Sequence, residues 1–128
     1  MQSSLGLLYS ALTEWAGFTP NEDEYKVMAL ASFGNDKFLS RARRICHYDK
    51  VAKSIEIQAG YFNFENYNKK TFNENFTNTF GFPDVVDLKP EKLWNSNLCN
   101  VILAFQRAIE ECVLELLDSI LQKNEFKN

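Results

Sequence analysis

Residues 98–120 read LCNVILAFQRAIEECVLELLDSI and hold the amphipathic pattern that decides the fold. Apolar side chains recur there at intervals of three and four residues, so they share one face of an α-helix. This face carries Leu98, Ile102, Phe105, Ile109, Cys112, Leu116 and Ile120. The residues that flank and widen it are Val101, Val113 and Leu117. A stripe of this width predicts a long helix that lies in a groove between other elements.

A first helix is predicted near the start of the chain, because apolar residues recur there at helical spacing. Its apolar face is formed by Leu5, Leu8, Leu12 and Trp15. Gly17 is expected to end it, since glycine has no side chain to clash at positive φ just past a helix. Phe18 can then fold back on the last helical turn.

A second helix is predicted over residues 20–33. Thr19 and Glu22 form a capping pair around Pro20, which suits the first helical position because it needs no N–H there. The acidic residues of the first turn suit the positive end of the helix dipole. Gly34 is expected to close this helix.

A third, shorter helix is predicted over residues 36–46. Its inward face is formed by Phe38, Ala42 and Ile45. Its outward face carries a basic strip of Lys37, Arg41 and Arg44. Such a strip on a short helix is usually a solvated surface, and the alternative is a phosphate site.

In the middle of the chain the spacing of apolar residues changes from a helical period to an alternating one. Residues 54–58, SIEIQ, alternate between polar and apolar side chains, which is typical of a strand. Ala59 and Gly60 interrupt the alternation before the aromatic residues 61–64, so a small β-hairpin is expected. Residues 63–78 are rich in Asn and Phe and are expected to be irregular or weakly helical, anchored by their rings.

The composition fits one globular domain of 128 residues, with 45% hydrophobic and 24% charged residues. The formal net charge of -3 argues against a nucleic-acid partner, because phosphate backbones bind clustered positive charge. No apolar run approaches the roughly 18 residues of a membrane span, and no export signal is recognised. A cytoplasmic location without a membrane partner is therefore expected, with the three cysteines as reduced thiols.

No catalytic residue and no metal centre are predicted from the residues themselves. The single histidine, His47, follows Cys46 and is separated from Asp49 by one residue. Adjacent residues at a helix end point in different directions, whereas a zinc site needs about four converging donors. His47 is therefore interpreted as a loop histidine.

A set of short motifs runs through the first 34 residues: SLGLLYS at 4–10, GF at 17–18 and EYKVMALASFG at 24–34. Together they resemble the O-carbamoyltransferases of the nodulation-factor and antibiotic-tailoring type. A weaker match continues through residues 61–64, 80–83 and 104–111, so it spans nearly the whole chain. After Pro83 that family tends to carry an arginine, whereas this chain has Asp84, and the anion contact of the arginine is not expected here.

The resemblance implies that residues 1–128 are a single domain, an internal portion of a carbamoyltransferase N-terminal domain. The expected fold class is α+β, predominantly helical, as a partial segment of an actin-like, ATPase-type domain with a small β-hairpin. The implied reaction transfers a carbamoyl group from carbamoyl phosphate, through a carbamoyl-adenylate, to a hydroxyl acceptor. ATP and a metal ion are implied for the complete enzyme.

The chain alone is expected to be inactive. The family's His-x-His metal motif and Gly-Gly-x-Ala-Leu-Asn nucleotide loop do not occur in it. Its implied partners are the remaining segments of the enzyme and, in the complete enzyme, a small hydroxylated acceptor. The alternative hypothesis is a non-catalytic helical module that binds a partner protein.

The resemblance also implies candidates for the substrate and nucleotide cleft. In the Glu-x-Lys motif, Lys26 could meet a phosphate of the carbamoyl-adenylate and Glu24 could orient the acceptor hydroxyl. The alternative is that both are ordinary charges of a helix surface. A more distant similarity to the threonylcarbamoyl-adenosine synthesis family adds Gly6, Tyr9 and Ser10, with Ser10 at the place of a nucleotide-facing aspartate. For Gly6 and Tyr9 the alternative is close packing against another helix.

Overall fold

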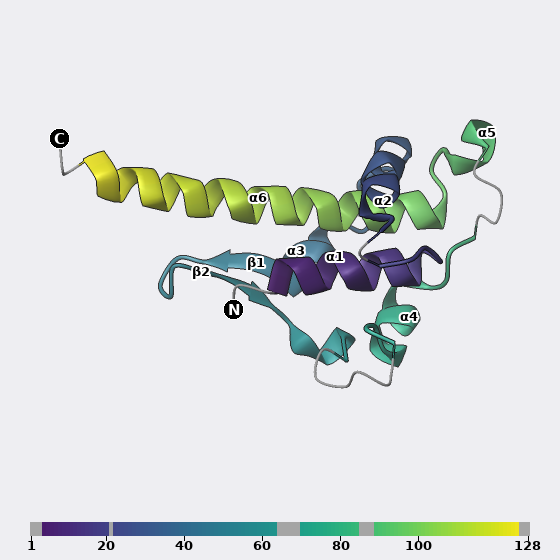
Figure 1. The fold of residues 1–128 in the computed structure, drawn as a ribbon, viewed down its shortest axis with the longest axis horizontal. Helices are drawn as coiled ribbons and strands as arrows, with labels where there is room; N and C mark the ends of the chain where they lie inside the picture. Colours follow the sequence, from purple (N-terminus) through teal and green to yellow (C-terminus); the bar gives the residue numbers. More distant parts are fainter. Residues whose placement is uncertain (1–3, 21, 64–69, 85–88, 126–128) are drawn as a thin grey trace.

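The computed structural model describes residues 4–20, 22–63, 70–84 and 89–125 (Figure 1). The α-helices are α1 (Ser4–Trp15), α2 (Glu24–Leu30), α3 (Leu39–Ile45), α4 (Glu74–Phe80), α5 (Pro90–Leu93) and α6 (Asn97–Glu125). The strands are β1 (Cys46–Asp49) and β2 (Ser54–Ile57), and two short 3-10 helices are η1 (Ala31–Phe33) and η2 (Ala59–Tyr61). This arrangement confirms the expected α+β class, which is mainly helical with a small hairpin.

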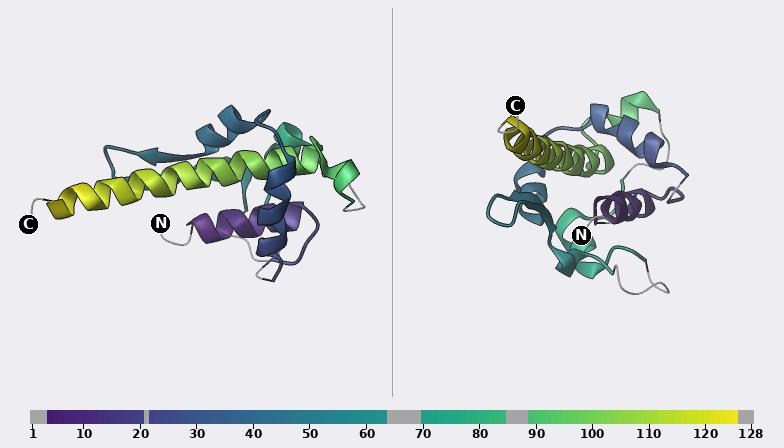
Figure 2. Two further views of the ribbon diagram at one scale, coloured as in Figure 1. Left: turned by 90° about the horizontal axis from the view of Figure 1, so that it is seen from above. Right: turned by 60° about the vertical axis from the view of Figure 1, so that its left-hand side comes forward.

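Helix α6 runs along most of the length of the molecule. The other helices gather around its first half, and the β1–β2 hairpin lies along its second half (Figures 1 and 2). Its apolar face is buried from Leu98 to Cys112, with Phe105 fully inaccessible. The predicted groove is therefore confirmed for this half. For Leu117 and Ile120 the prediction is wrong, because only the β1–β2 hairpin flanks this part of α6 and both side chains remain exposed.

The core around α6 is aromatic. Phe105 stacks on Phe76 of α4 at 5.8 Å between ring centroids and meets Phe80 edge-on at 5.2 Å. Phe76 also packs edge-on against Trp15 of α1 at 5.8 Å. Aromatic pairs in these geometries add to the free energy gained by burying their area. They join α1, α4 and α6 into one core.

Helix α1 ends as its sequence predicts. Gly17 adopts φ +92°, and its N–H donates to the carbonyl oxygen of Glu14 at 3.0 Å. The N–H of Phe18 donates to the carbonyl oxygen of Thr13 at 3.0 Å, which completes the paired bonds of a glycine-terminated helix. The chain therefore turns sharply here and enters α2 at an angle to α1 (Figure 1).

Helix α2 begins later than predicted, at Glu24 rather than at Pro20. The side chain that reaches back to the backbone N–H of Thr19 is Asp23 at 3.0 Å, not Glu22. The residues before Glu24 form a turn in which Asp23 N–H donates to the Thr19 carbonyl oxygen at 3.0 Å. The predicted Thr19–Glu22 capping pair is therefore wrong, because the N-cap residue of α2 is Asp23 and its side chain makes no capping hydrogen bond.

Helix α3 leads directly into the hairpin. Ala42 and Ile45 are buried, as predicted, and Arg41 and Arg44 are exposed. The helix ends at Ile45, and β1 pairs antiparallel with β2 from Cys46↔Ile57 to Asp49↔Ser54. His47 therefore lies on a strand, which corrects its interpretation as a loop residue.

The Asn-rich segment contains a helix that the sequence indicated only weakly. Asn73 caps α4 by accepting hydrogen bonds from the N–H groups of Asn75 at 2.9 Å and Phe76 at 3.3 Å. Asp84 caps α6 in the same way, since its carboxylate accepts from Asn97 N–H at 3.0 Å and Leu98 N–H at 3.2 Å. The residue that replaces the family's arginine thus anchors the start of α6.

Within the described ranges, no helix combines the length and apolar character that crossing a bilayer requires.

Candidate functional site

The five predicted cleft residues lie on the first two helices. Gly6, Tyr9 and Ser10 belong to α1, and Glu24 and Lys26 belong to α2. The two helices contact each other, and α2 also packs against α6. The two helices that carry these residues therefore lie against each other, with α2 at a steep angle to α1 (Figure 1).

On α1, the surroundings of Gly6 and Tyr9 differ. A Cβ atom added to Gly6 would meet nothing within 4 Å, so no close packing explains this glycine. Tyr9 is partly buried against the core, and this burial raises the pKa of its phenol, with the charge of Glu110 on α6 raising it further. Ser10 is half-buried on the same helix.

On α2, Lys26 is held by its own helix. Its amine lies 3.3 Å from the carboxylate of Asp23 and 5.9 Å from the centroid of the Tyr25 ring. The backbone N–H of Thr19, followed by Lys26, holds the pKa of Asp23 below its usual range. Asp23 is therefore ionised near neutral pH. The Lys26 side chain is 47% exposed, so solvent weakens its ion pair with Asp23.

The last glycine of the motif has a packing role that its sequence position did not reveal. A Cβ atom on Gly34 would lie 2.3 Å from the carbonyl oxygen of Cys99 and 2.7 Å from its carbonyl carbon, on α6. Its φ of -91° is open to any residue, so close approach and not backbone conformation requires glycine. Gly34 therefore sets how closely the motif segment lies against α6.

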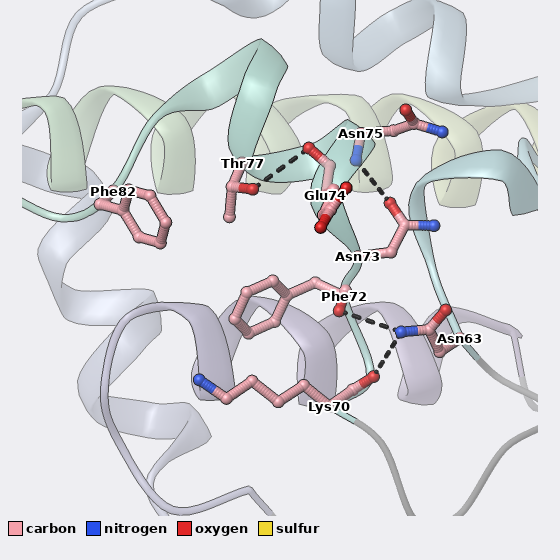
Figure 3. A pocket seen from close by; sticks show the side chains of 8 residues that line it. All are labelled: Asn63, Lys70, Phe72, Asn73, Glu74, Asn75, Thr77 and Phe82. Carbon is pink, nitrogen blue, oxygen red and sulfur yellow. Dashed lines mark hydrogen bonds between the residues drawn. The ribbon is translucent and has the colours of Figure 1, made fainter.

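A cavity of about 560 Å³ opens beside the start of α4 (Figure 3). It is lined by Asn63, Lys70, Phe72, Asn73, Glu74, Asn75, Thr77 and Phe82. Asn63 closes one wall, because its amide donates to the carbonyl oxygens of Lys70 at 2.9 Å and Phe72 at 3.2 Å. Thr77 donates to the carbonyl oxygen of Glu74 at 3.1 Å. Most polar groups of the lining thus hold the backbone in place.

Helix α1 positions this cavity. The carboxylate of Glu14 accepts from the N–H and the hydroxyl of Thr71, at 2.7 and 3.0 Å. The indole N–H of Trp15 donates to the carbonyl oxygen of Gly81 at 2.9 Å. These bonds fix the segments on both sides of α4, so the end of the SLGLLYS helix holds the cavity walls. The sequence did not reveal this role of Glu14.

The cavity can bind a small polar ligand. The ammonium of Lys70 and the carboxylate of Glu74 supply opposite charges, and neither takes part in an ion pair with another residue that the structure describes. The rings of Phe72 and Phe82 supply apolar surface. Sequence reasoning missed this site, and its one signal was the density of Asn and Phe in residues 63–78.

The metal ion that the resemblance implies for a complete enzyme does not fit the residues that the structure describes. No group of three or more His, Cys, Asp and Glu side chains converges anywhere in the described ranges. His47 is exposed on β1 and stands opposite Glu56, which gives at most two donors. No step of the chemistry is therefore assigned to a metal held by this part of the chain.

Comparison with known protein families identifies the family of this chain. The family model described as the carbamoyltransferase N-terminus matches residues 1–128. The chain therefore belongs to the carbamoyltransferase N-terminal family. No solved structure matches the chain.

Two curated relatives are much longer than this chain. An uncharacterized protein of Synechocystis sp. (sll1178) is 30% identical over 125 residues, which cover 98% of this chain and 20% of that protein. An uncharacterized protein of Methanocaldococcus jannaschii (MJ1058) is 30% identical over 124 residues, which cover 94% of this chain and 17% of that protein. The chain thus spans about a fifth of the length of the curated relatives that it matches.

Proposed function

We propose that this chain is a segment of an O-carbamoyltransferase of the nodulation-factor and antibiotic-tailoring type, within an actin-like, ATPase-type domain. The observation that carries the proposal is the family match over residues 1–128. The motifs at 4–10 and 24–34 support it, because they supply residues of α1 and α2, which contact each other.

The proposed reaction has three steps in the complete enzyme. Carbamoyl phosphate is first hydrolysed to carbamate and inorganic phosphate. A carbamate oxygen then attacks the α-phosphorus of ATP, which forms the carbamoyl-adenylate and releases pyrophosphate. A hydroxyl oxygen of the acceptor then attacks the carbamoyl carbon, AMP leaves, and the hydroxyl proton passes to a base. The chain alone is proposed to be inactive, and its location to be cytoplasmic.

In this proposal α1 and α2 border the cleft. Lys26 binds a phosphate oxygen of the adenylate after leaving Asp23, which lies 3.3 Å away. Glu24, at the first turn of α2, orients the acceptor hydroxyl. Gly6 leaves open space on α1 for a nucleotide, with Tyr9 and Ser10 one turn further along the helix. The remaining contacts to ATP, and the ligands of the metal ion, come from segments outside this chain.

An exchange of segments tests the proposal. In the Synechocystis relative, the matched 125 residues would be replaced by this chain, and pyrophosphate release from ATP would be measured with and without carbamoyl phosphate. We expect release that depends on carbamoyl phosphate in both the relative and the chimera, and none from the chain alone. Absence of release from the unmodified relative, or turnover by the chain alone, would contradict the proposal.

Variants of the chimera test the assigned residues. Lys26→Ala removes a contact to a charged phosphate, so it should lower kcat/KM about tenfold or more. Lys92→Ala is the matched control, because it removes the same charge from an exposed site on α5. An unchanged rate in Lys26→Ala would remove this lysine from the site.

The second candidate function, a non-catalytic module that binds a partner protein, is favoured by one feature of α6. Its C-terminal turns expose Leu114, Leu117, Ile120 and Leu121, of which Leu114 is 66% exposed. Apolar residues gathered in this way are typical of an interface. If the chimera is folded and inactive while the relative is active, the module hypothesis replaces the enzymatic one.

A further inference from the structure

A second cavity, of about 400 Å³, lies where α3, the end of β2, η2 and α4 meet. Its lining consists of Arg41, Arg44, Ile45, Gln58, Tyr61 and Thr79. Two of these six residues carry a positive charge and none carries a negative charge. The volume lies within the range of small-molecule sites, about 300–1,000 Å³.

The two arginines differ from their neighbour on the same helix. Arg43 is neutralised by Glu111 of α6, with its guanidinium nitrogens 2.7 and 2.9 Å from the two carboxylate oxygens. Arg41 donates to the carbonyl oxygen of Thr79 at 3.4 Å and has no ion pair with a carboxylate among the residues that the structure describes. Arg44 has no ion pair with any residue in the described ranges. Two arginines therefore line one cavity whose lining holds no carboxylate, in a chain whose net charge is -3.

The rest of the lining supplies neutral hydrogen-bonding groups on a fixed frame. The N–H of Gln58 donates to the carbonyl oxygen of Ile45 at 2.8 Å, which ties the end of β2 to α3. The N–H of Asn73 donates to the carbonyl oxygen of Tyr61 at 3.1 Å, which ties η2 to the cap of α4. These backbone bonds leave the side-chain amide of Gln58 and the hydroxyls of Tyr61 and Thr79 beside the arginines.

We propose that this cavity binds the phosphate group of a small phosphorylated molecule. Guanidinium groups present planar pairs of donors that match phosphate oxygens, and their hydrogen bonds to anions are about twice as strong as neutral ones. The amide and hydroxyl groups can donate to the remaining oxygens. This inference stands on the lining of the cavity and not on the proposed transfer reaction.

The test is an NMR titration of the ¹⁵N-labelled full chain with inorganic phosphate, with total ionic strength held constant by potassium chloride. We expect saturable shifts of the arginine side-chain N–H signals of Arg41 and Arg44 and of the Gln58 side-chain amide. Arg41→Gln and Arg44→Gln should each weaken binding about tenfold, the loss that corresponds to one charged hydrogen bond. Circular dichroism would confirm that each variant keeps the helical content of the parent chain.

Arg107→Gln is the matched control, because it removes one positive charge from an exposed position on α6 outside this cavity. It should leave phosphate binding unchanged. Shifts that do not saturate, or equal weakening by Arg107→Gln, would show screening by ions in general and would overturn the proposal.

Two further titrations identify the source of the phosphate group. Carbamoyl phosphate and ATP would be compared with inorganic phosphate under the same conditions. Tighter binding of one of them assigns the site to that class of ligand, and equal binding of all three assigns it to phosphate itself. Failure of the chimera to release pyrophosphate leaves these titrations unaffected, so the two proposals are tested separately.

Discussion

Replacing Gly34 by alanine should destabilise the fold, because the added Cβ atom has no room beside α6. The new Cβ atom would lie 2.3 Å from the carbonyl oxygen of Cys99 and 3.0 Å from the Cβ of Leu103. Non-bonded heavy atoms favour about 3.5 Å or more, so the η1 segment must move away from α6 by about 1 Å. Overpacking of this kind costs about 1–3 kcal/mol.

The movement also affects two hydrogen bonds beside Gly34. Asn35 N–H donates to the side-chain oxygen of Asn100 at 2.8 Å, and Asn95 N–H donates to the carbonyl oxygen of Phe33 at 2.8 Å. Each contributes about 1 kcal/mol, and a shift of about 1 Å would lengthen both. The expected loss of unfolding free energy for Gly34→Ala is therefore about 2–4 kcal/mol.

Urea unfolding followed by circular dichroism at 222 nm measures this loss. With a slope of about 2 kcal/mol per molar urea, the midpoint should fall by about 1–2 M. Gly6→Ala is the matched control, because its added Cβ meets nothing within 4 Å and alanine favours the helix, so stability should rise by up to about 1 kcal/mol. A Gly34→Ala midpoint equal to that of the parent chain would refute the close contact between η1 and α6.

Three further predictions concern the core and the titrating groups. Phe105→Ala should lower the free energy of unfolding in urea by about 3–5 kcal/mol, because Phe105 is fully buried between Phe76 and Phe80. Leu114→Ala, at an exposed site, should change stability little. Equal losses in the two variants would contradict the assigned burial. Arg43 holds the pKa of Glu111 below its usual range, so this pair stabilises the fold above about pH 4.3 and the stabilisation is lost as pH falls. In Glu111→Gln, the free energy of unfolding should therefore depend less on pH in that acid range. An unchanged pH dependence would refute the pairing. Burial raises the pKa of the Cys46 and Cys112 thiols, so the unfolded chain loses these protons first and the free energy of unfolding should decline above about pH 8.5. Both thiols should react with Ellman's reagent only after unfolding in urea. Fast reaction of the native chain would contradict their burial.

The helices whose apolar faces meet the core could be predicted from sequence, because periodicity reports burial directly. Helix α1 and the first half of α6 follow their spacing, and Gly17 ends α1 through its positive φ. The same spacing continues through Leu117 and Ile120, yet these side chains are exposed. A pattern shows that a face is suited to burial, and only the neighbouring elements decide whether it is covered.

Features that depend on long-range partners were not predictable in the same way. The role of Gly34 depends on Cys99, 65 residues further along the chain, and that of Glu14 depends on Thr71. The predicted third helix included Cys46, the first residue of β1, and His47 was interpreted as a loop residue, because the strand is defined only by its pairing with β2. The cavity beside the start of α4 depends on how the Asn-rich segment folds, and the spacing of apolar residues there predicts no clear helix or strand.

The candidate cleft residues came from the resemblance and not from spacing. The structure places them on two helices in contact, but their roles require a bound substrate. Lys26 illustrates this limit of sequence reasoning, because its pairing with Asp23 is equally compatible with a surface charge and with a lysine waiting for phosphate.

The most direct measurement is the distance from the Lys26 amine to a bound nucleotide, in a crystal structure of the active chimera grown with ATP. The account predicts that α1 and α2 border the nucleotide and that this nitrogen lies about 3 Å from a phosphate oxygen. A structure in which both helices face away from the nucleotide, with Lys26 still paired to Asp23, would contradict it.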